Sequence, residues 1–274
     1  MPGNLPTKGE TMPRQLVTSI AALGALWLLS AAPVRAISNG APDIDHPNVG
    51  ALGVKFGESR FIVCSGTLIA PDVFLVAAHC IAGLQPEHVF VTFDVDIFAP
   101  YATIEASELH YDPAFLHINQ GDSHDLGVVI LSEDVKDWQG VHVTPAQLAP
   151  AGLLDQLAMR GGLRGTSFVN VGYGFSSTFQ DGRPRFEIDG VRNASTSPFK
   201  GLTLTLLKQL MNSNATGEGG VCFIDSGGPK FLPGTNTIVA VEKGGDAMCR
   251  AESVAYRLDI PQARAFLGQF VTLP

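Results

Sequence analysis

The feature of this sequence that most restricts its fold is a series of short apolar runs separated by Gly, Pro, Asn and Asp. Several runs alternate apolar and polar residues with a period of two, and β-branched residues are frequent in them. Many short strands with turn residues between them are typical of an all-β sandwich or barrel. The expected strands lie at residues 50–56, 63–70, 73–78, 88–93, 126–132, 166–174, 201–208, 236–242 and 253–259.

One segment near the carboxyl end favours a helix instead. Residues 259–270 read "DIPQARAFLGQF", where Asp259 can cap the amino end and Pro261 suits the first turn. Apolar residues recur there at helical spacing and predict one apolar face. They are Ile260, Ala263, Leu267 and Phe270. Residues 143–162 carry few strand signals, so we interpret them as the connector between two β-rich halves.

The amino-terminal 36 residues form a separate unit. Residues 12–36 contain Arg14 near their start, then an apolar run, and end in Val34-Arg35-Ala36. A basic start, an apolar middle and a small-x-small end predict a secretory signal peptide over residues 1–36. The alternative is an uncleaved membrane anchor, for which the run is short. We therefore expect an extracellular or periplasmic protein that has no membrane contact after cleavage.

Charge and cysteine content narrow the possible functions. The formal net charge is −8, which argues against a nucleic-acid-binding surface, and no His or Cys falls at a zinc-ligand spacing. We expect no metal and no cofactor. Export makes disulfides plausible, and four cysteines allow three pairings. Sequence order favours Cys64–Cys80 and Cys222–Cys249, and four free thiols are the alternative.

Three polar residues stand at places where side chains can carry chemistry. His79 follows an apolar run and precedes Cys80 in "LVAAHC" (75–80), Asp125 precedes the run "LGVVIL" (126–131), and Ser226 lies between an acid and two glycines in "DSGGP" (225–229). Each one alone is more typical of a structural or turn position. Together they can form a nucleophile, a base that takes its proton, and an acid that orients the base.

These stretches resemble the trypsin-like serine proteases with the chymotrypsin fold. The order His79, Asp125, Ser226 is similar to that of the family, whereas subtilisins and α/β-hydrolases order their triads differently. The stretch "CSGTLIAPDVFLVAAHC" resembles the family's histidine region, and "HDLGVVIL" its aspartate region. "DSGGP" resembles its nucleophile region, and "VGYG" (171–174) a turn early in its second barrel. The resemblance covers nearly all of the chain after residue 36.

The resemblance implies two packed six-stranded antiparallel β-barrels with a short C-terminal helix, preceded by the signal peptide. The expected domains are a first barrel over 37–145 with His79 and Asp125, and a second over 146–274 with Ser226. The implied function is a secreted serine endopeptidase that works through an acyl-enzyme on peptide or protein substrates. We expect a monomer. The alternative is a catalytically silent homologue that binds a peptide or protein partner in the same cleft.

The resemblance also implies an oxyanion hole and an activating ion pair. The oxyanion donors would be the backbone N–H groups of Ile224 and Ser226. Signal cleavage after Ala36 would expose Ile37, whose α-ammonium would pair with Asp225. The family nearly always has Gly where this chain has Ile224. Because a β-branched residue resists positive φ, we expect backbone strain at Ile224.

The residues that align with the family's substrate pocket also differ. Gly220 takes the place of the aspartate of trypsin-type members and is followed by Val221, so trypsin specificity is not expected. Ala240, Val241 and Glu242 align with the Ser-Trp-Gly strand. Glu242 is expected either to narrow the pocket or to receive a basic group of the substrate.

Overall fold

A computed structural model of the protein describes residues 1, 3, 37–116 and 122–274. The predicted signal peptide falls almost wholly outside these residues. Within the described chain, no helix is both long and apolar enough to cross a bilayer.

The first half of the described chain forms a closed six-stranded antiparallel barrel. Its hydrogen-bonded order is β2-β3-β4-β7-β6-β5. The strands are β2 (Val49–Phe56), β3 (Ser59–Ala70), β4 (Val73–Val76), β5 (Val89–Thr92), β6 (Ile104–Tyr111) and β7 (Gly127–Leu131). The short 3₁₀ helices η2 (Ala78–Cys80), η3 (Pro86–His88) and η4 (Pro113–Leu116) lie in its connections.

The second half forms another six-stranded ring, β14-β11-β16-β17-β18-β15, which pairing of β14 with β15 closes. These strands are β11 (Ser167–Gly172), β14 (Asn193–Leu202), β15 (Leu206–Leu210), β16 (Pro229–Phe231), β17 (Thr237–Gly245) and β18 (Glu252–Arg257). Two short strands extend the ring: β1 (Ala41–Pro42) pairs with β14, and β10 (Gln147–Leu148) lies parallel to β17. Separate hairpins are β8 (Asp137–Trp138) with β9 (Val141–His142), and β12 (Ser176–Gln180) with β13 (Arg183–Glu187).

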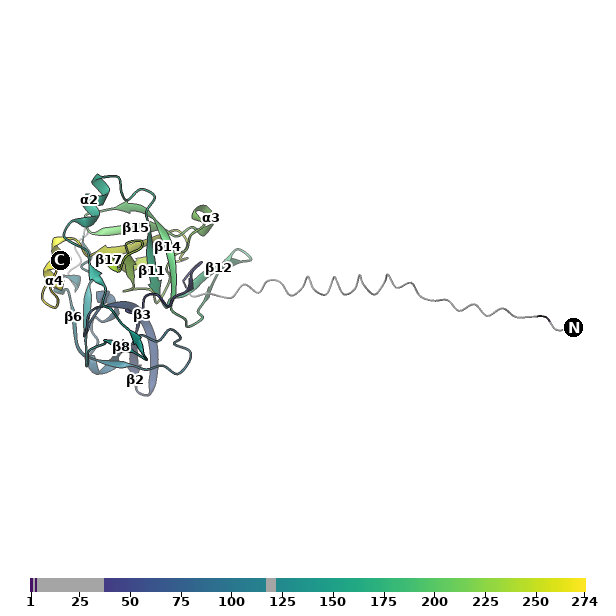
Figure 1. The fold of residues 1–274 in the computed structure, drawn as a ribbon, viewed down its shortest axis with the longest axis horizontal. Helices are drawn as coiled ribbons and strands as arrows, with labels where there is room; N and C mark the ends of the chain where they lie inside the picture. Colours follow the sequence, from purple (N-terminus) through teal and green to yellow (C-terminus); the bar gives the residue numbers. More distant parts are fainter. Residues whose placement is uncertain (2, 4–36, 117–121) are drawn as a thin grey trace. The chain divides into compact units, whose positions relative to one another are not determined.

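The two barrels pack on a shared apolar core. Figure 1 shows β2, β3 and β6 of the first barrel on one side and β11, β14, β15 and β17 of the second on the other. One buried cluster joins Leu52 and Phe74 of the first barrel to Phe231 and Tyr256 of the second. The predicted architecture of two packed antiparallel barrels is therefore confirmed. The domain limits at 145 and 146 stay a prediction.

The part of the chain that the structure describes also contains three short α-helices: α2 (Leu153–Met159), α3 (Ser213–Thr216) and α4 (Pro261–Leu267). The predicted C-terminal helix is present as α4, with Pro261 at its first turn, but it is shorter than expected. The predicted cap is wrong, because Ile260 is the N-cap residue and makes no side-chain bond. The Asp259 carboxylate instead accepts from the Leu154 N–H and from the Arg257 guanidinium.

The predicted strand at 201–208 is also wrong, because β14 ends and β15 begins within it. The Thr203 hydroxyl oxygen accepts from the Leu206 N–H at 2.9 Å and so holds a tight turn. Threonine can form such side-chain turns, which compete with a continuous strand.

Candidate active site

His79 and Asp125 meet where two neighbouring strands end. His79 lies in η2, just after β4, and Asp125 lies just before β7. Val76 of β4 opposes Gly127 of β7 in the antiparallel ladder, so both side chains reach the same edge of the barrel. The Asp125 carboxylate accepts from the His79 backbone N–H at 3.0 Å and contacts its Nδ1 at 2.8 Å. A proton on Nδ1 leaves Nε2 free to act as a base.

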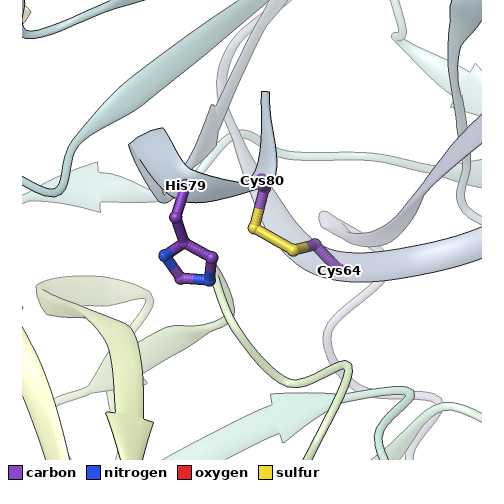
Figure 2. A group of neighbouring side chains, drawn as sticks. All are labelled: Cys64, His79 and Cys80. Carbon is purple, nitrogen blue, oxygen red and sulfur yellow. A yellow bond between two sulfur atoms is a disulfide. The ribbon is translucent and has the colours of Figure 1, made fainter. Parts of the chain in front are cut away.

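A disulfide holds the turn that carries His79. Cys64 of β3 is bonded to Cys80, the residue after the histidine, and Figure 2 shows the imidazole beside the two sulfurs. Ligand atoms of Cys64, His79 and Cys80 lie within 4.8 Å of one another. The two sulfurs are bonded to each other, so this cluster offers no thiolate to a metal ion. The predicted pairings Cys64–Cys80 and Cys222–Cys249 are both present.

Ser65 of the first barrel forms two hydrogen bonds to the turn that carries Ser226. Its N–H donates to the Ser226 carbonyl at 2.9 Å, and its hydroxyl donates to the Ile224 carbonyl at 3.1 Å. Because Ser65 directly follows Cys64, these hydrogen bonds place the Ser226 turn beside the Cys64–Cys80 disulfide, which is next to His79. Among the described residues, the Ser226 hydroxyl makes no hydrogen bond to the imidazole. Such bonds are often long in active sites without substrate.

Two backbone N–H groups of this turn are available to an anion. The Phe223 carbonyl accepts from the Phe175 N–H at 2.9 Å, so the N–H of Ile224 in the same peptide points away from Phe175. In the described part of the chain, neither the Ile224 N–H nor the Ser226 N–H has a protein acceptor. Free N–H groups close together in a turn form a concave anion site.

Ile224 takes the unusual backbone conformation that this turn needs. Its φ is 75°, and the Asp225 N–H donates to the Cys222 carbonyl at 3.2 Å. This is the third position of a β-turn, where positive φ normally selects glycine. For an L-residue with a side chain, that conformation costs about 1–2 kcal/mol.

Asp225 lies buried beneath the turn. Its carboxylate accepts from the N–H groups of Gly174 and Cys222, both at 2.8 Å, and 1% of the residue is exposed. A Cβ on Gly174 would lie 2.3 Å from this carboxylate, so only glycine permits the contact. Burial raises the pKa of Asp225 to about 7, although the Cys222 and Gly174 N–H groups act in the opposite direction.

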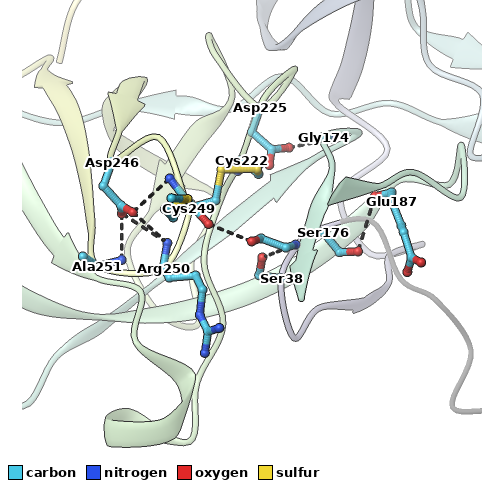
Figure 3. The surroundings of a disulfide bond; sticks show 12 residues. Ser38, Gly174, Ser176, Glu187, Cys222, Asp225, Asp246, Cys249, Arg250 and Ala251 are labelled. Atoms are coloured by element: carbon cyan, nitrogen blue, oxygen red, sulfur yellow. Dashed lines mark hydrogen bonds between the residues drawn. A yellow bond between two sulfur atoms is a disulfide. The ribbon is translucent and has the colours of Figure 1, made fainter. Parts of the chain in front are cut away.

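The segment that begins at Ile37 lies beside this carboxylate. Ile37 is fully buried, and its nitrogen, here an amide, donates to the Gly174 carbonyl at 3.3 Å and not to Asp225. The next residue, Ser38, is held by the Gly220 N–H, which donates to its carbonyl at 2.9 Å. Figure 3 shows Ser38, Gly174 and Asp225 close to the Cys222–Cys249 disulfide.

The buried Asp225 predicts a pH-dependent stability for a chain in which Ile37 is still joined to Ala36. Its folded-state pKa is raised above its unfolded value near 4. The stability is therefore fully present below about pH 4 and is lost as the pH rises through about 7, by on the order of 4 kcal/mol. Urea denaturation between about pH 4 and 8 measures this loss.

Asp225→Asn in the same uncleaved chain should remove that pH dependence. The exposed Asp137 provides the control, because Asp137→Asn should leave the pH dependence unchanged. Equal pH profiles for wild type and Asp225→Asn would contradict the prediction.

The five residues predicted to line a substrate pocket do not all lie in one place. Gly220 and Val221 lie just before the Cys222–Asp225 turn and are buried. Ala240 and Val241 are fully buried in the two hydrophobic clusters of the fold. Fully buried side chains do not line an open substrate pocket, so this expectation does not hold for these two residues. β17 becomes accessible further along, at the half-buried Lys243 and Gly244 and the exposed Gly245.

Glu242 is also engaged elsewhere, in a buried ion pair. Its carboxylate lies 2.6 Å from Lys230 Nζ, and the side chains are 2% and 0% exposed. Lys230 also donates to Asn170 Oδ1 at 2.8 Å, and the Ser253 hydroxyl donates to Glu242 at 2.6 Å. The expectation that Glu242 receives a basic group of the substrate is wrong, because its buried carboxylate already forms an ion pair with Lys230.

Comparison with known proteins agrees with this geometry. The family model described as Trypsin matches residues 39–261 of the chain. A search of curated proteins found no match. The family match covers both barrels and every residue of the described site except Ile37 and Ser38, so the chain belongs to the trypsin family.

Proposed function

We propose that the protein is a secreted serine endopeptidase, with Ser226 as nucleophile, His79 as general base and Asp125 as the residue that orients the imidazole. The observation that carries the proposal is the His79–Asp125 pair beside a turn that has two free N–H groups. The family implies a peptidase that acts on peptides or proteins.

The proposed reaction follows from these positions. The Ser226 hydroxyl oxygen attacks the scissile carbonyl carbon while its proton passes to His79 Nε2. The N–H groups of Ile224 and Ser226 stabilise the negative charge on the carbonyl oxygen. The imidazolium then gives the proton to the leaving amine, and the acyl group stays on Ser226 as an ester. Water, deprotonated by His79, hydrolyses this ester and restores the serine.

Activation is proposed to follow removal of residues 1–36. The Ile37 nitrogen lies against Gly174, whose own N–H donates to Asp225, so a new ammonium at Ile37 is within reach of that carboxylate. The ion pair would neutralise a buried charge and hold the Cys222–Ser226 turn. Trypsin-type specificity is not proposed, because Gly220 offers no carboxylate and Glu242 is paired with Lys230.

The direct test is hydrolysis of a peptide library by purified protein that begins at Ile37, with Ser226→Ala as control. Cleavage by the wild type that the variant lacks would support the proposal. Equal cleavage by both would mean that a contaminating protease was measured. Absence of cleavage by the wild type over the whole library would overturn the endopeptidase proposal.

A second candidate, a silent homologue that binds a peptide, is favoured by Ile224, which stands at positive φ beside the nucleophile. The Ile224→Gly variant tests which of the two candidate functions is correct. Because the backbone already has φ of 75°, we expect kcat to change by less than about fivefold while the free energy of unfolding rises by about 1 kcal/mol.

The measurements are steady-state kinetics and urea denaturation of the Ile224→Gly variant and the wild type. A rise in kcat by about 10²–10³ would favour the silent homologue, because it would mean that Ile224 turns the oxyanion donor away.

A further inference from the structure

Two backbone segments lie next to the Ser226 turn. One is Gly220–Val221, which leads into Cys222, and the other is the accessible end of β17 at Gly244–Gly245. The Cys222–Cys249 disulfide ties the two segments together. The resemblance to the family places the base of the substrate pocket at Gly220.

The side chain of Met211 lies against both of these segments. A Cβ added to Gly220 would lie 2.6 Å from Met211 Cβ and Cγ and 2.8 Å from its Sδ. A Cβ added to Gly245 would lie 3.1 Å from Met211 Cε. The methionine therefore extends from one segment to the other, and only 2% of it is exposed.

The backbone around Met211 fixes it in this place. Met211 directly follows β15, and its N–H donates to the Ala251 carbonyl at 3.0 Å. Asp246 holds the neighbouring loop, because its carboxylate accepts from the N–H groups of Ala251 and Glu252 at 2.7 and 3.0 Å (Figure 3 shows Asp246 and Ala251). The loop that carries Ala251 is thus firmly held, and Met211 is positioned by it.

The two residues at this position carry no charge. Gly220 has no side chain, and the Met211 thioether is neutral. A charged substrate group would find no partner in either of them, and burying an unpaired charge is costly.

We propose that Met211 is a specificity-determining residue that makes the substrate pocket shallow. The residue whose carbonyl is attacked would then be Gly, Ala or Ser, and larger or charged side chains would be excluded. This inference rests on the proposed endopeptidase function and adds a substrate class to it.

The test measures kcat/KM on peptides that differ only in the residue before the scissile bond: Gly, Ala, Val, Leu, Phe or Lys. The wild type is expected to prefer Ala over Leu. In Met211→Ala, the ratio of Leu to Ala cleavage is expected to rise at least about tenfold, since one methylene in an apolar pocket changes selectivity by about 10–200-fold. Met211→Val, which leaves a smaller cavity, should shift the ratio in the same direction.

Met159→Ala is the matched control, because Met159 lies on α2 and is exposed. It should leave the Leu to Ala ratio unchanged. Cleavage of the Ala peptide by each variant shows that the variant is folded. A fluorophosphonate that labels activated serines reports on Ser226 independently of the pocket.

Labelling together with efficient wild-type cleavage after Leu, Phe or Lys would overturn the role of Met211 and leave the proposed function intact. Labelling with an unchanged ratio in both Met211 variants would overturn it as well. No labelling of a chain that begins at Ile37 would overturn the proposed function and this inference together.

Discussion

Asp125→Asn is expected to lower kcat by about 10⁴-fold while KM changes little. The Asp125 carboxylate contacts His79 Nδ1 at 2.8 Å and so selects the tautomer that leaves Nε2 as base. An amide at this position can donate its own hydrogen to Nδ1, and the proton then sits on the wrong nitrogen. The measurement is steady-state hydrolysis of the best peptide from the library.

The matched control is Asp137→Asn. Asp137 also contacts a histidine ring, that of His142 at 3.4 Å, but both side chains are about 70% exposed, and the pair lies on the β8–β9 hairpin. This variant should keep wild-type kcat. A loss of less than about tenfold in Asp125→Asn would contradict the assigned role of Asp125.

Lys230→Met is expected to lower the free energy of unfolding by about 3–5 kcal/mol. The Lys230 ammonium is fully buried and is the ion-pair partner of Glu242. It also lowers the pKa of Asp225 through its charge, while Glu242 raises it. Without Lys230, the negative charges of Glu242 and Asp225 in the barrel interior are less well neutralised. Urea denaturation at neutral pH measures the change.

Two further variants make this prediction specific. Lys136→Met removes an exposed ion pair with Asp134 and should change the free energy of unfolding by less than about 1 kcal/mol. The double variant Lys230→Met/Glu242→Leu removes both buried charges and should recover most of the loss. A small effect of Lys230→Met alone would show that water reaches Glu242.

Local patterns predicted much of the fold. The alternating run at 166–174 contains β11, and the run at 126–132 contains β7. The helix signal at Pro261 located α4. The strand predicted at 201–208 was wrong because the turn there depends on a hydrogen bond to the Thr203 hydroxyl, and the hydrophobicity pattern does not reveal that bond.

The candidate site was predicted only as far as its local motifs extend. His79, Asp125 and Ser226 lie in recognisable stretches, whereas Ser65, Lys230 and Met211 act through contacts between segments far apart in the chain. Ser65 and Ile224 are 159 residues apart, and nothing in the sequence shows that they meet. The error at Ala240 and Val241 has the same origin, since register along β17 is set by pairing with β16 and β18.

The central claim is that Ser226 is an activated nucleophile. Intact mass of the purified protein, before and after treatment with a fluorophosphonate, tests it most directly. We predict a chain that begins at Ile37 and gains one adduct, and a Ser226→Ala variant that gains none. A chain that begins at Ile37 and gains no adduct would contradict the claim.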